Sequence, residues 1–163
     1  MSRPIRKAAR GYGKKAEGAP FKFEEIAAAI RKTVAGRLFG FELIELEGGR
    51  ATLRMRVRPK HIQIHGVVHG GIVAAMADTA AALAGYPLLP RGTQLATIEM
   101  KINYLEPLDR GEIVAEGRIL RLGRNFVVAE CEVRDSAKRL AAKALLTFAI
   151  APPKAPESNS ARR

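Results

Sequence analysis

One stretch of the sequence, residues 69–84, constrains the fold more than any other. It reads HGGIVAAMADTAAALA, is dense in alanine, and is apolar at almost every position of a helical repeat. A helix that is apolar all round is expected to be buried all round. The rest of the chain must therefore supply enough apolar surface to enclose this helix.

The segments before this helix predict a short helix and a β-hairpin. A helix is expected at residues 23–34, because glutamates open the segment, basic residues close it and Gly36 follows. Strands are expected at residues 41–47 and 51–58, joined across Gly48-Gly49, a dipeptide suited to a tight turn. In the second strand apolar side chains alternate with arginines, which predicts one buried and one solvated face.

The segments after the helix predict the rest of a sheet. Four strand-like runs are separated by short turn sequences, and they span residues 95–105, 112–120, 125–134 and 139–150. Short connections make consecutive strands antiparallel. The predicted fold class is therefore α+β, with a curved antiparallel sheet wrapped around one long central helix and a short helix at the N-terminal side.

Charge is concentrated at the two ends of the chain. The formal net charge is +12, of which residues 1–22 carry +6 and residues 151–163 carry +2. Residues 1–22, rich in glycine, alanine and lysine, are expected to form a mobile basic arm, and the proline-rich residues 151–163 an unstructured tail. The predicted domain, residues 23–150, keeps +4, which suits an anionic ligand but is not a basic block for nucleic acid.

Other features predict a cytoplasmic protein. The N-terminus lacks the apolar run of a secretory signal, and the longest uncharged apolar stretch, near residues 66–77, is too short and too interrupted by glycine to predict a membrane span. The lone Cys131 excludes an internal disulfide and a multi-cysteine metal site, and it lies in an alternating strand where a packed thiol is expected.

Asp78 is the most informative residue, because it is the only charged group between His69 and Pro90. Burial of an unpaired carboxylate is costly, so a carboxylate in this helix points to a functional site. Two structural explanations compete with this one. Asp78 could cap a second helix that begins at Thr79, or it could be a core carboxylate satisfied by that threonine.

His69-Gly70-Gly71 marks the start of the helix. Glycines at this point allow a ligand to approach backbone N–H groups that have no intrahelical partner, and the helix dipole favours negative charge there. From Gly70 to Asp78 is eight residues, or about 12 Å at about 1.5 Å per residue. One helix therefore cannot bring both elements to one carbonyl group, whereas two antiparallel copies related by a two-fold axis can. A homodimer with two shared sites is the prediction.

The motifs GVVHGG-x6-ADTA, KINYLEP and RILRLGRNF, in this order, resemble the hotdog-fold thioesterase superfamily and within it the phenylacetate-pathway (PaaI-type) acyl-CoA thioesterases. The resemblance extends from about residue 39 to residue 150. It implies a homodimer or homotetramer that hydrolyses acyl or aroyl thioesters of coenzyme A and needs no metal or redox cofactor.

The resemblance also assigns roles to residues of this chain. Asp78 matches the helix carboxylate that acts as nucleophile or general base, and Gly70 matches the amide that polarises the thioester carbonyl. Gln63 stands where the family usually has asparagine to position the lytic water, and Thr97 matches a small hydroxyl on the neighbouring strand. The implied substrate-binding residues are His69 and Gly71 at the helix start, and Arg121 and Arg124, which flank a turn and would meet the phosphates of coenzyme A unless they are only solvated turn residues.

Rival chemistries lack their residues. None of the four serines lies in a nucleophile elbow, which excludes a serine hydrolase. His61, His65 and His69 have helical spacing, but glycine and valines interrupt the helix that a shared metal site would need. The absence of proline between Pro59 and Pro87 argues against a hotdog dehydratase. A non-catalytic acyl-CoA sensor stays as the alternative, although residues 1–38 are too short and too poor in apolar periodicity for a DNA-reading helix pair.

Overall fold

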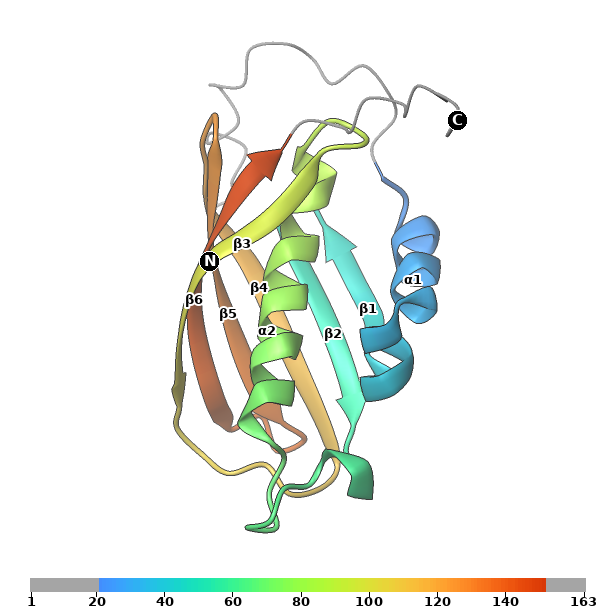
Figure 1. The fold of residues 1–163 in the computed structure, drawn as a ribbon, viewed down its shortest axis with the longest axis vertical. Coiled ribbons are helices and arrows are strands. Elements are labelled where there is room, and N and C mark those ends of the chain that lie inside the picture. The colour runs from blue at the N-terminus through green and yellow to red at the C-terminus, as the bar shows by residue number, and fades with distance from the viewer. Residues whose placement is uncertain (1–20, 152–163) are drawn as a thin grey trace, which may run out of the picture.

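The computed structural model describes residues 21–151, which form one antiparallel sheet and a long helix packed on it (Figure 1). The helices are α1 (Phe23–Lys32) and α2 (Gly70–Gly85), with shorter turns at Gly36–Gly40, Pro59–His61 and Tyr86–Leu88. The strands are β1 (Glu42–Glu47), β2 (Arg50–Arg56), β3 (Gln94–Tyr104), β4 (Glu112–Leu122), β5 (Phe126–Asp135) and β6 (Leu140–Ala151). In residues 21–151 the sheet has six strands in the order β1-β2-β4-β5-β6-β3, and every neighbouring pair is antiparallel. The predicted fold class and element order are confirmed.

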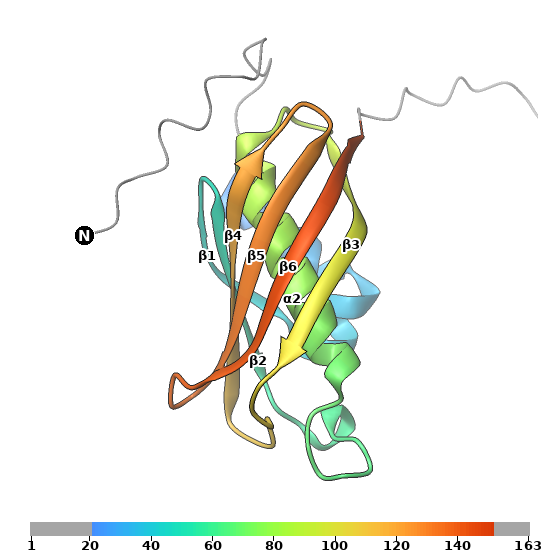
Figure 2. The same ribbon diagram turned by 90° about the vertical axis from the view of Figure 1, so that its left-hand side faces the viewer.

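Helix α2 lies across one face of the curved sheet, and β3 runs beside it at the sheet edge (Figures 1 and 2). Its alanines allow a close approach, since Ala77, Ala80 and Ala81 are completely buried. The sheet side makes the same allowance at Gly117 of β4, where an added Cβ would lie 2.4 Å from the carbonyl of Ala80. Small side chains on both elements thus let the helix backbone pack against the sheet.

The expectation that α2 is buried all round is wrong for the single chain. Gly71 is exposed, and one stripe of the helix is only partly buried, comprising Ala74, Ala75, Asp78, Thr79 and Ala82. The physical reason is that the six-stranded sheet of residues 21–151 covers only one side of the helix. The stripe that stays open is the one that carries Asp78.

By length and hydropathy alone one helix of residues 21–151 qualifies as a candidate membrane span, which the sequence pattern did not predict. Gly70–Leu88, 19 residues, passes that test of length and hydropathy. The apolar run read from the sequence ended before Asp78. A single carboxylate, however, does not lower the mean hydropathy of the whole helix below the value typical of membrane-spanning helices. In the fold this segment is the core helix, packed on β4, β2 and β5.

Contacts with the domain begin before α1. The ring of Phe21 meets Tyr86 edge-on at 5.8 Å between centroids, and the guanidinium of Arg91 lies 5.4 Å from the centroid of the Phe21 ring. The predicted basic arm and tail otherwise fall on residues 1–20 and 152–163, which lie outside the described residues. The predicted helix at residues 23–34 ends earlier, at Lys32, because the Thr33 hydroxyl bonds to the carbonyl of Ile30 and the next turn is a π-helical one.

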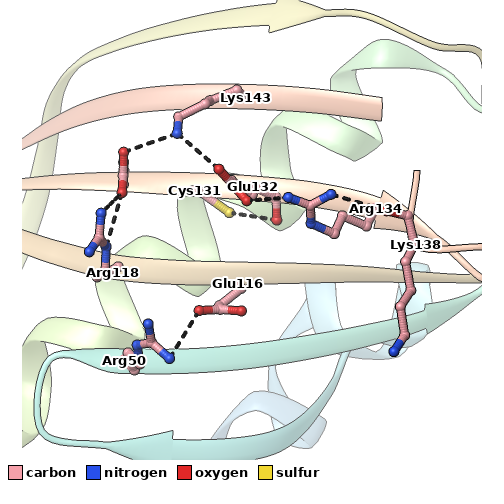
Figure 3. A network of polar contacts seen from close by, with 9 residues as sticks. Arg50, Glu116, Arg118, Cys131, Glu132, Arg134, Lys138 and Lys143 are labelled. Atoms are coloured by element: carbon pink, nitrogen blue, oxygen red, sulfur yellow. Dashed lines mark hydrogen bonds and ion pairs between the residues drawn. The ribbon is translucent and has the colours of Figure 1, made fainter. Parts of the chain in front are cut away.

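The outer face of the sheet carries a network of ion pairs (Figure 3). Lys143 of β6 lies 3.3 Å from Glu130 and 2.9 Å from Glu132, Arg118 pairs with Glu130, and Arg50 lies 3.4 Å from Glu116. These cations are neutralised by adjacent carboxylates across the strands. The outer face is therefore a solvated surface, and the face that holds α2 contains the candidate site.

Cys131 occupies the core on the inner side of β5. It is completely buried, and this burial raises the pKa of its thiol to about 12. Because the thiolate is the reactive form, a thiol that stays protonated is not a nucleophile at neutral pH. The packed role expected from the alternating sequence agrees with this environment.

Candidate active site

The start of α2 presents one unpartnered backbone donor. His69 is the N-cap, and its Nδ1 accepts a hydrogen bond from the Gly71 N–H at 2.9 Å. Its own N–H donates to the carbonyl of His61 at 2.9 Å, which fixes the approach to the helix. Within residues 21–151 the Gly70 N–H has no hydrogen-bond acceptor. The cap thus engages Gly71 and leaves Gly70 as the donor available to an anionic oxygen.

Asp78 lies eight residues further along an uninterrupted helix. Because α2 runs from Gly70 to Gly85 without a break, Asp78 does not cap a second helix. Thr79 does not satisfy it either, since the Thr79 hydroxyl donates to the Ala75 carbonyl at 2.7 Å. Instead the Thr97 hydroxyl of β3 donates to Asp78 Oδ1 at 2.8 Å. Both structural alternatives for Asp78 are therefore wrong, and one carboxylate oxygen is held by the neighbouring strand while the group stays on the open stripe.

Gln63 lies in the loop that leads into α2. Its backbone N–H donates to the Val67 carbonyl at 2.8 Å, and its side-chain Oε1 accepts from the His65 N–H at 2.9 Å. These bonds hold the loop in a tight turn beside the helix start. Gln63 and Gly70 both line a cavity of about 320 Å³, so the fold brings these two predicted site residues together.

Tyr104, at the end of β3, is a site residue that the sequence reasoning did not single out. Its hydroxyl donates to the Gly70 carbonyl at 2.9 Å, and it lines the same cavity. The NYLEP segment served only as a family signature, although a tyrosine that ends an inward-facing strand is a signal for a polar group at the edge of a site. Figure 2 shows the end of β3 next to the first turn of α2.

Arg121 and Arg124 lie at the other end of the molecule from Gly70. The β4–β5 connection is at the end of the sheet opposite the start of α2 (Figures 1 and 2). Arg121 pairs with Val128 across a bulge, so its side chain lies on the outer face, while Val127 and Ala129 beside it are completely buried. One chain therefore does not bring these arginines to Gly70.

The predicted site residues in the described chain fall into two groups. Gly70, Gln63 and Tyr104 gather at the start of α2, whereas Asp78 and Thr97 lie near its middle, about 12 Å away by helix rise. The histidines do not form a third group, since His61 is buried in a 3-10 turn and His69 caps α2. Among residues 21–151 no cluster of His, Cys, Asp or Glu could hold a metal ion.

Comparisons with known proteins identify the family of this fold. The family model described as "Thioesterase superfamily" matches residues 65–142. A "Putative esterase" of Saccharolobus solfataricus is 35% identical over 119 residues, which are 71% of this chain and 84% of the relative. The crystal structure of a thioesterase from Haemophilus influenzae superimposes with a TM-score of 0.77 at 26% identity, and covers 84% of this chain and 95% of that one. The chain belongs to the hotdog-fold thioesterase superfamily.

A further relative has a named substrate. It is the 1,4-dihydroxy-2-naphthoyl-CoA hydrolase of Listeria monocytogenes, which is 24% identical over 111 residues. The match covers 68% of this chain and 90% of the relative.

Removing the Thr97 hydroxyl is expected to lower kcat by about tenfold, because a hydrogen bond to a charged group is worth about 1.5–3 kcal/mol and this one is partly exposed. The variant Thr97→Val keeps the shape, and Thr97→Ser should restore most of the rate. Steady-state hydrolysis of an acyl-CoA provides the measurement. The matched control is Thr79→Val, because the Thr79 hydroxyl bonds to the Ala75 carbonyl and not to Asp78. Equal rates for Thr97→Val and wild type would remove Thr97 from the site.

Acidification is expected to destabilise the fold through His61. Its imidazole is 1% exposed, Nδ1 accepts from the Arg58 N–H at 3.1 Å, and Nε2 has no partner within residues 21–151. Burial, aided by the neighbouring Lys60 and Arg58 charges, lowers the pKa of His61 below its usual 6.5. The unfolded chain therefore binds the proton first, and stability falls as the pH drops below about 6.5, by up to about 1.4 kcal/mol per pH unit.

Urea unfolding between pH 5 and pH 7.5 tests this expectation. His61→Asn retains an acceptor for the Arg58 N–H and should flatten the pH dependence in this range. His65→Asn, at an exposed position two residues after Gln63, is the control and should leave the dependence unchanged. An equally steep decline in His61→Asn would assign the effect to other groups.

Proposed function

We propose that this protein is an acyl-CoA thioesterase of the PaaI type, which hydrolyses an acyl- or aroyl-CoA to the free acid and coenzyme A. The observation that carries the proposal is the Asp78 carboxylate, bonded through one oxygen to Thr97 and placed on the open stripe of α2. Membership of the thioesterase superfamily supports the reaction type. The naphthoyl-CoA hydrolase among the relatives supports a coenzyme A thioester with an aromatic acyl group.

In the proposed mechanism the thioester carbonyl oxygen accepts a hydrogen bond from the Gly70 N–H at the positive end of the α2 dipole. Asp78 of the partner subunit takes a proton from water as the water oxygen attacks the carbonyl carbon, or it attacks that carbon itself and the resulting anhydride is hydrolysed. In both routes the C–S bond breaks, a C–O bond forms and the thiolate of coenzyme A takes up a proton. Gln63 orients the water, and no metal or redox cofactor takes part.

The two routes differ in the source of one oxygen atom. A single turnover in water enriched in oxygen-18 places the heavy isotope in the acid product if Asp78 is a general base. If Asp78 is the nucleophile and water attacks the Asp78 carbonyl of the anhydride, the first turnover instead leaves the heavy isotope in the enzyme carboxylate. Heavy isotope in the protein therefore identifies the nucleophilic route. Mass spectrometry of product and protein distinguishes them.

Two exposed surfaces of the chain favour the homodimer that this mechanism requires. Among residues 21–151 no strand pairs with the outer edge of β3, which lies beside the partly exposed stripe of α2, and β3 exposes Ile98 by 56%. An unpaired strand edge of this length is a surface on which a second copy can pair. Antiparallel pairing about a two-fold axis would set the start of one α2 against Asp78 of the other. The same symmetry would bring Arg121 and Arg124 of one subunit toward the start of α2 in its partner. A pair of such dimers would give a tetramer.

The test is steady-state hydrolysis across a panel of aromatic, short and long acyl-CoAs. The rate is monitored by the release of the free thiol of coenzyme A. Turnover with kcat/KM in the ordinary enzymatic range, above about 10⁴ M⁻¹s⁻¹ for at least one aromatic or short acyl group, is the expected result. Tight binding of an acyl-CoA without hydrolysis would instead identify a sensor. If no panel member is either bound or hydrolysed, the proposal is refuted.

A further inference from the structure

We propose that Tyr104 is the specificity-determining residue of the acyl cavity, narrowing its mouth so that it favours compact, uncharged acyl groups, aryl groups among them, over long chains. This inference rests on the proposed function and adds the substrate class. Its basis is one cavity and the contacts of one side chain.

Tyr104 is fixed at the reacting end of the cavity. Its hydroxyl donates to the Gly70 carbonyl at 2.9 Å, and its ring lies so close to Gly70 that an added Cβ there would be 3.2 Å from the tyrosine Cζ. Partial burial raises the pKa of Tyr104, while 53% of the residue stays exposed at the cavity mouth. The ring thus rests on the glycine whose N–H is the proposed oxyanion donor.

The cavity walls favour an apolar occupant. Its side-chain lining is mostly aliphatic, and its polar groups come from Gln63, Tyr104 and Glu106; the aliphatic wall includes Val67, Val68, Val73, Leu105 and Leu108. In the proposed mechanism Gln63 bonds to the lytic water and so is not available to the acyl group. Glu106 adds a carboxylate that disfavours acyl groups with a second negative charge. A neutral acyl group with an aromatic or branched body therefore matches these walls.

The size of the cavity points the same way. Its volume of about 320 Å³ is near the lower end of the range of about 300–1,000 Å³ found for small-molecule sites. Tyr104 is the largest side chain in the lining and its only aromatic ring, so its removal changes the cavity more than any other single truncation there. Its face can also pack against an aryl group.

The experiment compares kcat/KM for phenylacetyl-CoA, decanoyl-CoA and succinyl-CoA in wild type, Tyr104→Ala and Tyr104→Phe. Wild type should favour phenylacetyl-CoA over both others. Tyr104→Ala should raise the ratio of decanoyl-CoA to phenylacetyl-CoA by about tenfold or more, since pocket size alone discriminates by such factors. Tyr104→Phe keeps the ring and should retain the wild-type ratio, while kcat falls a few-fold at unchanged KM because Gly70 loses its hydrogen bond. Tyr86→Ala, a tyrosine at the far end of α2, is the matched control and should leave the ratio unchanged.

The outcomes separate this inference from the proposed function. If wild type hydrolyses none of the three thioesters or any other acyl-CoA, both fail. If wild type hydrolyses acyl-CoAs but Tyr104→Ala has the wild-type ratio, only the inference fails. Should Tyr104→Ala not fold, Tyr104→Trp narrows the cavity instead and should lower the ratio of decanoyl-CoA to phenylacetyl-CoA. An unchanged or higher ratio in Tyr104→Trp overturns the inference.

Discussion

Replacing Asp78 with asparagine is expected to lower kcat for acyl-CoA hydrolysis by at least about a thousandfold while the fold survives. The substitution preserves the size of the side chain and still offers an oxygen to the Thr97 hydroxyl, so the contact at 2.8 Å can persist. It removes the anion that would take a proton from water or attack the carbonyl carbon. The measurement is steady-state release of coenzyme A, with thermal unfolding as the check on the fold.

Asp109→Asn provides the matched control for this change. Asp109 is a carboxylate of the β3–β4 connection, 56% exposed and 3.8 Å from Arg110. The same chemical change there should alter kcat by less than about twofold. Activity of Asp78→Asn within a few-fold of wild type, in a folded protein, would refute the role of Asp78.

Mixing two inactive variants is expected to restore activity, because each site takes Gly70 from one subunit and Asp78 from the other. The variants are Asp78→Asn and Gly70→Val, whose side chain would obstruct the oxyanion donor and press on Tyr104. In a heterodimer one site carries both defects and the other carries neither. With random subunit exchange at equal concentrations, half of the dimers are heterodimers with one intact site, so the mixture should reach about a quarter of the wild-type rate.

Two differently tagged copies of Asp78→Asn, mixed in the same way, form the control and should stay inactive. Exchange is followed by capture on one tag and detection of the other. Confirmed heterodimers of the two folded variants that hydrolyse nothing would exclude the shared site, since sites built within one chain cannot recover by mixing.

The fold was largely predictable from local patterns. The apolar helix, the Gly48-Gly49 turn and the alternation in β5 each follow from short-range chemistry, and the strand ends found in the structure differ from the predicted ones by at most two residues. Asp78 and Gly70 could likewise be singled out, because a lone charge in an apolar helix and paired glycines at a helix start are visible without coordinates. Their roles as catalytic groups stay predictions.

The partners of these residues could not be predicted in the same way. Thr97 was identified only through resemblance to a family, and Tyr104 not at all. Strict alternation along β3 would put these two residues on opposite faces, because they are seven positions apart. In the structure Thr97 pairs with Phe148 and Tyr104 pairs with Ala142. Phe148 and Ala142 are both buried on the inner face of the sheet. Thr97 and Tyr104 therefore lie on the same face, because a bulge between Thr97 and Glu99 shifts the register.

What the sequence by itself determined is the class of fold, the central helix and the two elements of that helix on which the proposed chemistry depends, because periodicity and the cost of a buried charge act locally. Only the tertiary structure decided that α2 keeps an open stripe, that Thr97 bonds to Asp78 and that Tyr104 bonds to Gly70. These contacts join residues 19 and 34 positions apart, and they depend on how one sheet curves around one helix and where a single bulge interrupts its edge strand.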